Sequence, residues 1–544
     1  MVLGSVDCES ERGVELTADE RGVCRAFQWA GSGVIIRPFL LAIGIWAISL
    51  WIPCASQADP KQEDFSLSKL GVAGEILGLI PADLDGDSLV DIVIFHKKGL
   101  PPQETRWVSI FWQGADGTYG TAPDQSWELD PLATIVDVGD VDPGRGLEIC
   151  YLTPVSVRYY KLADHRFSES GTELFACSTM TVFPSKNQIP TVDFVRNWDG
   201  WPGDEIAVLS FGGLDIYKPD ANGHFGTRSV MHIDLQTRLA TSASGTERER
   251  ISGVHASFEF PDLTVADFNG DGRTDIIATL EDRLQVFLQS TDGSFSRQPA
   301  ASVNFDVRTQ EEKQEGNTEL RTVVADINKD GFADAVVTKM TAKGLSSFRS
   351  VISLFWGCAL GYPTVPDQVI VSEGSASAEV TMRDVNGDGN LDLIMPSIHI
   401  SIAAIIRILI TRNVPITYNI FLCHDGPRYP DRPDFEKEVN YKIDLSGESD
   451  TQAMTLDGDF NGDKIRDFVL ATRDDELSVY PGSQGNSREL FAKKPAAKVT
   501  ADAFGDLIAE DLNHDGFSDM LLRYPNTKDR KGFVEVLMNR RTIK

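Results

Sequence analysis

The sequence predicts an all-β protein built from a repeated unit, and three observations support this prediction. A nine-residue motif with acidic or amide side chains at positions 1, 3, 5 and 9 occurs six times. Each copy is followed by a short apolar run such as IVIF or AVVT, which is typical of a buried strand. Asp-Gly and Asn-Gly pairs, the preferred hairpin turns, recur after other apolar segments. Units spaced about 50 to 75 residues apart indicate a repeat architecture.

The six copies all carry oxygen donors at alternate positions of a short loop. They are DLDGDSLVD at 83–91, DFNGDGRTD at 267–275, DINKDGFAD at 326–334, DVNGDGNLD at 384–392, DFNGDKIRD at 459–467 and DLNHDGFSD at 511–519. Crowded carboxylates repel one another unless a cation lies among them. Ca²⁺ accepts roughly six to eight oxygen ligands in flexible geometry, so the motif predicts about six Ca²⁺ sites.

We predict that positions 1, 3, 5 and 9 supply the side-chain ligands, with the backbone carbonyl of position 7 as a further ligand. The side-chain ligands are Asp83, Asp85, Asp87, Asp91, Asp267, Asn269, Asp271, Asp275, Asp326, Asn328, Asp330, Asp334, Asp384, Asn386, Asp388, Asp392, Asp459, Asn461, Asp463, Asp467, Asp511, Asn513, Asp515 and Asp519. The carbonyl ligands are those of Leu89, Arg273, Phe332, Asn390, Ile465 and Phe517.

The first half of the motif is similar to an EF-hand, which also requires a Glu at position 12 and flanking helices. Position 12 is apolar in every copy: Ile94, Ala278, Val337, Met395, Leu470 and Leu522. The motif is therefore predicted to be a hairpin loop between two strands, with positive φ at position 6, which is usually Gly. Ser88 and Lys464 replace that Gly, and the charge of Lys464 predicts that the loop at 459–467 binds calcium most weakly. His514, at position 4, is expected to face solvent.

Through these motifs, residues 65–544 resemble the FG-GAP/VCBS repeats of the integrin α-subunit β-propeller and of many bacterial exported proteins. The resemblance implies a β-propeller of four-stranded antiparallel blades. Two degenerate copies bring the count to eight blades, with seven as the alternative: DVDPGRGLE at 140–148 and NWDGWPGDE at 197–205. The first has Gly144 in place of an acid, and in the second we expect the closing acid to be displaced by one. Both are expected to keep the hairpin and to bind calcium weakly or not at all.

The last repeat ends at Lys544 before its fourth strand, so we predict that residues 65–80 complete it and close the propeller. Residues 226–262 carry a polar insertion, predicted to be an exposed loop. Residues 396–440 carry an apolar insertion that arginines interrupt, which makes it too short for a membrane span. We expect a partly buried helix followed by a strand there, with a partner-binding helix as the alternative.

The N-terminal region predicts export. An apolar run at 39–52 and small residues up to Ala58 indicate a signal peptide at 37–58, or an uncleaved membrane anchor. Cys54 fits a lipoprotein signal badly. Residues 1–36 are expected to be a poorly ordered extension or a mis-assigned start. The propeller is accordingly predicted to be extracellular, periplasmic or attached to the cell surface.

The formal net charge of −30 argues against nucleic acid and anionic membranes as partners, apart from the possible N-terminal anchor. The motifs themselves supply much of this charge. Cys150 and Cys177 could form a disulfide or remain buried thiols, and no CxxC pattern indicates zinc or redox chemistry.

Two functions remain open. The first is a calcium-stabilised binding or adhesion module for a protein or a glycan. The second is a polysaccharide-active enzyme, since an eight-bladed rhamnogalacturonan lyase has a similar form. No catalytic motif is found, and no catalytic residue is predicted. Trp107, Trp112, Trp127, Trp198 and Trp201 could stack on sugars, although packing between blades is the simpler expectation.

Overall fold

The computed structural model describes residues 25–27 and 64–541, except 182–187, 201–202, 221, 242–253, 343–347, 374, 377–379, 424–427, 443–452, 474, 485–488, 503–504 and 528. These residues form two compact units. The first unit comprises residues 1–31 and 196–380, and the second comprises residues 32–195 and 381–544. The predicted signal segment at 37–58 and most of the extension at 1–36 lie outside the described residues.

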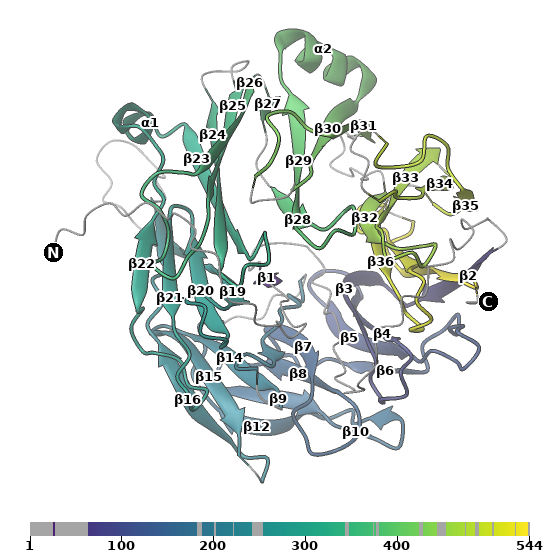
Figure 1. Cartoon of the computed structure of the whole chain (residues 1–544). Helices are drawn as coiled ribbons and strands as arrows, with labels where there is room; N and C mark the ends of the chain where they lie inside the picture. Colours follow the sequence, from purple (N-terminus) through teal and green to yellow (C-terminus); the bar gives the residue numbers. More distant parts are fainter. Residues whose placement is uncertain are drawn as a thin grey trace, which may run out of the picture. The chain divides into compact units, whose positions relative to one another are not determined.

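The second unit contains five antiparallel sheets (Figure 1). Blade 1 is β3 (Glu75–Ala82), β4 (Asp91–Lys98), β5 (Thr105–Phe111) and β6 (Gln125–Glu128). Blade 2 is β7 (Ile135–Gly139), β8 (Glu148–Leu152), β9 (Ser156–Tyr160) and β12 (Thr172–Ala176), with the small hairpin β10 (Leu162–Ala163) and β11 (Arg166–Phe167). Blade 6 is β28 (Thr381–Arg383), β29 (Asp392–His399), β30 (Asn413–Phe421) and β31 (Phe435–Lys442). Blade 7 is β32 (Met454–Gly458), β33 (Asp467–Arg473), β34 (Glu476–Tyr480) and β35 (Ala497–Thr500). Blade 8 is β36 (Asp506–Glu510), β37 (Asp519–Arg523), β38 (Phe533–Asn539) and β2 (Phe65–Gly71).

In the first unit, the described residues form three antiparallel blades and one separate two-stranded hairpin. Blade 3 is β13 (Val195–Arg196), at the division between the units, with β14 (Glu205–Ser210), β15 (Gly213–Pro219) and β16 (Phe225–Met231). Blade 4 is β19 (Asp262–Ala266), β20 (Asp275–Leu280), β21 (Arg283–Phe287) and β22 (Ala301–Asn304), and β1 (Arg25–Phe27) pairs with β19. Blade 5 is β23 (Thr318–Ala325), β24 (Asp334–Ala342), β25 (Phe348–Phe355) and β26 (Gln368–Glu373). The short strand β27 (Ser375–Ala376) follows. The prediction of an all-β, eight-bladed propeller of antiparallel sheets is thus confirmed.

The strand that completes blade 8 comes from the N-terminal side of the repeats, as predicted. β2 pairs with β38 in continuous antiparallel register from Phe65↔Asn539 to Gly71↔Phe533. The prediction was too broad in one respect, because only 65–71 belong to blade 8 while β3 begins blade 1. Leu70 is fully buried in a cluster that joins blades 8 and 1, and the Val90 N–H donates to the Leu512 carbonyl between them.

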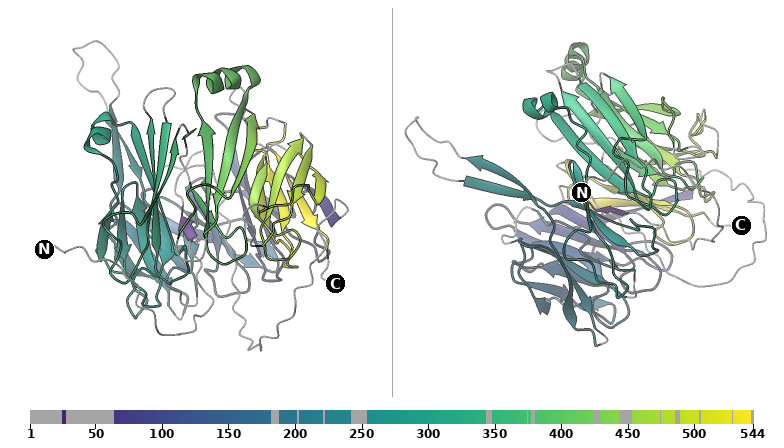
Figure 2. Two further views of the ribbon diagram at one scale, coloured as in Figure 1. Left: turned by 45° about the horizontal axis from the view of Figure 1, so that its top comes forward. Right: turned by 60° about the vertical axis from the view of Figure 1, so that its left-hand side comes forward.

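The two long insertions have regular structure. Residues 226–262 include the hairpin β17 (Gln236–Thr241) and β18 (Val254–Glu259) instead of only a loop, and Figure 2 shows it extending away from its neighbours in the first unit. Between β29 and β30 lies the predicted helix, α2 (Ile402–Thr411), capped by Ser401. None of its residues is fully buried, and Ile402, Ile406, Leu409 and Ile410 are exposed. A second, short helix is α1 (Gln310–Glu315).

The core lies between adjacent blades, because each strand in a blade interior buries both of its faces. In the second unit, Phe95 of blade 1 and Tyr151 of blade 2 share one cluster, and Val469 of blade 7 and Leu522 of blade 8 share another. Cys150 and Cys423 are buried, while Cys177 and Cys358 are half-buried. Among the described residues, the search for a helix long and apolar enough to cross a membrane found none.

Candidate metal-binding loops

Each of the six motifs connects the first and second strands of a blade, as the sequence predicts. The six motifs therefore lie in blades 1, 4, 5, 6, 7 and 8, in the hairpins β3–β4, β19–β20, β23–β24, β28–β29, β32–β33 and β36–β37. The degenerate copies occupy the equivalent connection in blades 2 and 3. All eight loops consequently have the same place in their sheets.

The loops need left-handed backbone at two positions. Position 6 has positive φ in every copy, including Ser88 (74°) and Lys464 (68°), so the prediction for this position is confirmed. Position 4 also has positive φ, which the sequence analysis missed because this position is not always Gly. Lys329 (56°) and His514 (55°) adopt it despite their β-carbons. His514 is exposed, as predicted.

The first Asp of each loop folds the chain around its own carboxylate. In blade 1, Asp83 Oδ1 accepts hydrogen bonds from the N–H groups of Gly86 (2.8 Å) and Asp87 (3.0 Å). Its Oδ2 accepts from the N–H of Ser88 (3.0 Å). The N–H of position 6 donates to the same oxygen in the other five loops, over 2.7–3.1 Å. This common hydrogen-bond pattern gives the six loops the same backbone conformation around the first Asp.

Positions 3 and 5 are held side by side. Asp85 Oδ1 accepts from the N–H of Asp87 (3.0 Å), and Asp87 Oδ1 accepts from the N–H of Leu89 (2.8 Å). In the other five loops position 3 is Asn, whose Nδ2 donates to the position-5 carboxylate over 2.9–3.1 Å. The oxygens predicted to bind metal are therefore already ordered by local hydrogen bonds.

The ninth-position Asp also accepts backbone hydrogen bonds that hold the loop to the third strand of its blade, which the motif alone does not predict. Asp91 is buried, and its Oδ2 accepts from the N–H of Leu84 (3.1 Å), while its Oδ1 accepts from the N–H of Gln113 beyond β5 (2.9 Å). Burial raises the pKa of Asp91 to about 8, against the two hydrogen bonds that lower it, and the charges of Asp85 and Asp87 raise it further. The ninth-position Asp of each of the other five loops also accepts two backbone N–H groups, one from position 2 of its own loop and one from a residue at or just after the end of the third strand. These residues are Asp275, Asp334, Asp392, Asp467 and Asp519.

The donor set of blade 1 fits a divalent cation. Asp83, Asp85 and Asp91 offer carboxylate oxygens that lie within 4.8 Å of one another, and among the described residues they are the one group of acidic, His or Cys side chains that could hold a metal ion by this criterion. The fourth predicted ligand of the loop, Asp87, is not part of the group. Oxygens bound to Ca²⁺ at about 2.3–2.6 Å must lie within roughly 5 Å of one another. A hard cation is the group that such an all-oxygen, anionic cluster suits.

Two basic side chains contact carboxylates of the motifs, one from outside its loop and one from within it, and neither contact was predicted from sequence. His165, in the β10–β11 turn of blade 2, lies 2.8 Å from Asp85 Oδ2 through Nδ1 and stacks on Trp112 at 4.0 Å between ring centroids. In blade 4, the Arg273 guanidinium pairs with Asp271 at position 5. A cation entering either loop must compete with these groups for an oxygen.

The degenerate loops correct one detail of the sequence analysis. The closing acid of the second copy is not displaced: Glu205 is the ninth residue, and its Oε2 accepts from the N–H groups of Trp198 (2.7 Å) and Asp199 (3.3 Å). Glu148 has the same place in blade 2 and accepts from Val141 and Asp142. Both loops keep the hairpin, as predicted.

Trp107, Trp112, Trp127 and Trp198 make packing contacts within blades and between neighbouring blades. Trp198 is fully buried beneath the guanidinium of Arg196, and Trp127 is buried against Tyr160. Trp107 lies under the ammonium of Lys98. Trp201 lies outside the described residues. Packing is thus the observed role of these rings.

Residues 267–337, which include two of the six motifs, match the FG-GAP-like repeat. No curated protein matches the chain in sequence. Among solved structures, one match is described as the structural basis of specific recognition of non-reducing terminal N-acetylglucosamine by an Agrocybe aegerita lectin. It is 12% identical, covers 86% of this chain and 96% of that chain, and has a TM-score of 0.39, values from which nothing follows about the ligand of this chain. The other four loops repeat the hydrogen bonds of the two within the matched segment, so the eight-bladed β-propeller fits an FG-GAP repeat protein.

Proposed function

We propose that this protein is an exported calcium-binding β-propeller that acts as a binding or adhesion module for a protein or a glycan. The observation that carries the proposal is the repeated loop in which positions 1, 3 and 5 are ordered by backbone hydrogen bonds around one another. Calcium supplies positive charge to these loops and neutralises the repulsion among their carboxylates. The proposed ligands are the 24 side chains predicted from the motifs.

The role proposed for calcium is structural. All side-chain donors of a loop come from one hairpin, and the ninth-position Asp is buried inside the blade. A metal in such a loop stabilises the connection between the first three strands of its blade. The ligand of the module is then recognised by other residues, on surfaces that depend on the calcium-bound fold.

The proposal is tested by counting bound ions. Purified protein at dialysis equilibrium with about 10 mM free Ca²⁺ is expected to hold about six ions per chain in excess of the dialysate by elemental analysis, and to bind them with Kd of about 10⁻⁴–10⁻³ M by calorimetry. Asp83→Asn with Asp85→Asn removes two anionic ligands from one loop and should remove one ion. Asp116→Asn, in an Asp-Gly turn outside the motifs, should leave the count unchanged. Fewer than four ions in the wild type contradicts the proposal.

The enzyme alternative has a direct assay. A uronate lyase needs a cationic group that neutralises the substrate carboxylate and a base beside it, and the calcium of such an enzyme bridges substrate and protein. We expect no rise in the absorbance of unsaturated products when the protein is incubated with pectic or other uronate polymers, with or without Ca²⁺. Steady β-elimination by protein free of contaminating lyase would replace the binding module with the enzyme.

A further inference from the structure

The residue that lies opposite the ninth position of each loop is different in blades 2 and 3, which have degenerate motifs, from that in the six blades with complete motifs. The residue at position 10, counted from the start of each motif, pairs with a residue of the third strand of its blade. The residue that follows this partner in the chain therefore lies opposite position 9, and we call it the facing residue. In blade 3, Ile206 pairs with Tyr217, so Lys218 faces Glu205. In blade 2, Ile149 pairs with Tyr160, so Lys161 faces Glu148. In the blades with complete motifs the facing residue is uncharged: Trp112, Leu288, Trp356, Leu422, Pro481 and Met538.

The blade 3 lysine is bound by the acids of its loop. Its Nζ lies 2.7 Å from Asp199 Oδ2 and 2.7 Å from Glu205 Oε1. The side chain of Lys218 is 15% exposed and those of the two acids are 1% exposed. The ammonium therefore lies between positions 3 and 9, two of the four positions that carry the predicted metal ligands in the complete motifs.

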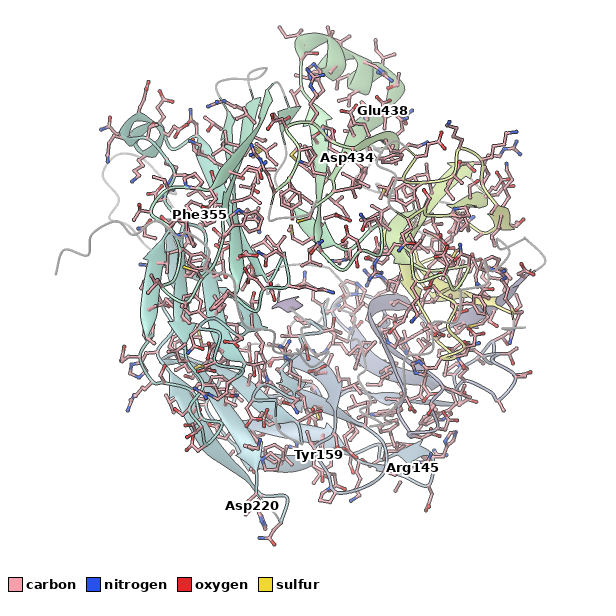
Figure 3. The ribbon with its side chains drawn as sticks, viewed as in Figure 1. Arg145, Tyr159, Asp220, Phe355, Asp434 and Glu438 are labelled. Carbon is pink, nitrogen blue, oxygen red and sulfur yellow. The ribbon has the colours of Figure 1, made fainter. Side chains whose placement is uncertain are left out.

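Blade 2 repeats the arrangement at a more exposed site. Lys161 Nζ lies 2.5 Å from Asp142 Oδ2, at position 3 of the loop. The hydroxyl of Tyr159, labelled in Figure 3, donates to Asp142 Oδ1 over 3.2 Å. Two lysines from separate repeats thus bind the same loop position with the same atom.

Two further changes accompany the lysine. The ninth acid is Glu in both lysine blades and Asp in the other six. In the complete motifs, one oxygen of this Asp accepts an N–H from the residue after the facing position, such as Gln113 or Gly482. In blade 3 that residue is Pro219, which has no N–H to donate. Glu205 Oε1 meets the ammonium instead.

At the atoms that Lys218 contacts, the exchange in blade 3 keeps the charge balance of the five complete motifs that contain Asn. A complete motif with three Asp and one Ca²⁺ has a net charge of −1, because calcium supplies two positive charges. The two carboxylates of the blade 3 loop that contact Lys218 give the same net charge with one ammonium. The ammonium also has three donors, which suits two carboxylates better than a full oxygen shell. Burial lowers the pKa of Lys218, but the hydrogen bonds that its ammonium donates to Asp199 and Glu205 outweigh this effect, so the pKa is raised and the amine stays charged.

From these contacts we infer that Lys161 and Lys218 take the place of calcium in blades 2 and 3, so that these two blades are held by an internal cation and fold without metal. The inference rests on the proposed calcium binding of the other six loops. It also predicts which side chain must be removed before the blade 3 loop will accept an ion.

The test uses Lys218→Met in the full chain, with Lys498→Met as the matched control, because Lys498 also pairs with an acid, Glu476, but outside the motifs. With the lysine gone, Asp199 and Glu205 lose the ammonium that both of them contact. Lys218→Met is expected to melt below the wild type in a chelator, to regain most of this loss in millimolar Ca²⁺, and to raise the ion count from six to seven. Lys498→Met should match the wild type in all three measurements.

A reverse exchange keeps the test decisive if Lys218→Met does not fold. Leu288→Lys with Asp275→Glu gives blade 4 the lysine-blade residues and is expected to lower the ion count from six to five. If the wild type binds six ions and neither variant changes this count, the inference about the lysines is wrong and the proposed calcium binding still holds. A wild type that binds no calcium overturns both.

Discussion

Removal of calcium is expected to lower the melting temperature of the protein by about 10 °C. Extracellular calcium modules bind with Kd of about 10⁻⁴–10⁻³ M, so at 10 mM free Ca²⁺ each occupied loop contributes roughly 1.4–2.7 kcal/mol to the free energy of unfolding. Six loops together contribute on the order of 10 kcal/mol. Unfolding of roughly 480 residues changes the entropy by about 1 kcal/mol/K, which converts this loss into the expected shift.

The measurement compares thermal unfolding in 10 mM Ca²⁺ with unfolding after chelation. Mg²⁺ is the control cation, because it requires shorter bonds and near-octahedral geometry and should restore little of the loss. Binding of any partner should disappear on chelation together with the calcium-stabilised fold. An identical melting temperature with and without chelator would show that the loops do not couple metal to folding.

Deletion of β2 is expected to cause aggregation or unfolding at a much lower temperature. A chain that starts at residue 73 lacks the strand that covers β38, so seven residues of β38 lose their backbone partners. The buried side chains of Val534, Val536 and Met538 lose the packing of Leu70 at the same time. An unpaired apolar edge is a template for association with other chains.

The control for this deletion is a chain that starts at residue 61, which keeps β2. Point variants separate strand packing from truncation: Leu70→Ala, fully buried, is expected to cost about 2–5 kcal/mol, whereas Leu67→Ala, 52% exposed on the same strand, should cost less than about 0.5 kcal/mol. Equal melting temperatures for the chains that start at 61 and 73 would contradict the role of β2 in closing blade 8.

The sequence by itself was sufficient for the class of fold, the hairpin position of each motif and the origin of the closing strand. These features depend on local pattern: the oxygen donors at alternate positions, the apolar run after each Asp, and a last repeat that is one strand short. The first two patterns act within about ten residues, where chain geometry leaves few alternatives, whereas the third follows from counting the strands of the repeats along the chain. The extent of the closing segment was less certain, because nothing in residues 65–80 marks the turn between β2 and β3.

Only the tertiary structure decided which side chains and backbone groups from outside a loop contact its carboxylates. The ninth Asp bonds to the third strand, His165 reaches Asp85 from the next blade, and Lys218 reaches Asp199 from the neighbouring strand. These partners lie between 19 and 80 residues away, so no motif contains them. The physical reason is that a nine-residue pattern determines where the carboxylates lie. The charged group that contacts them comes from another strand, and the strand register determines which side chain that is.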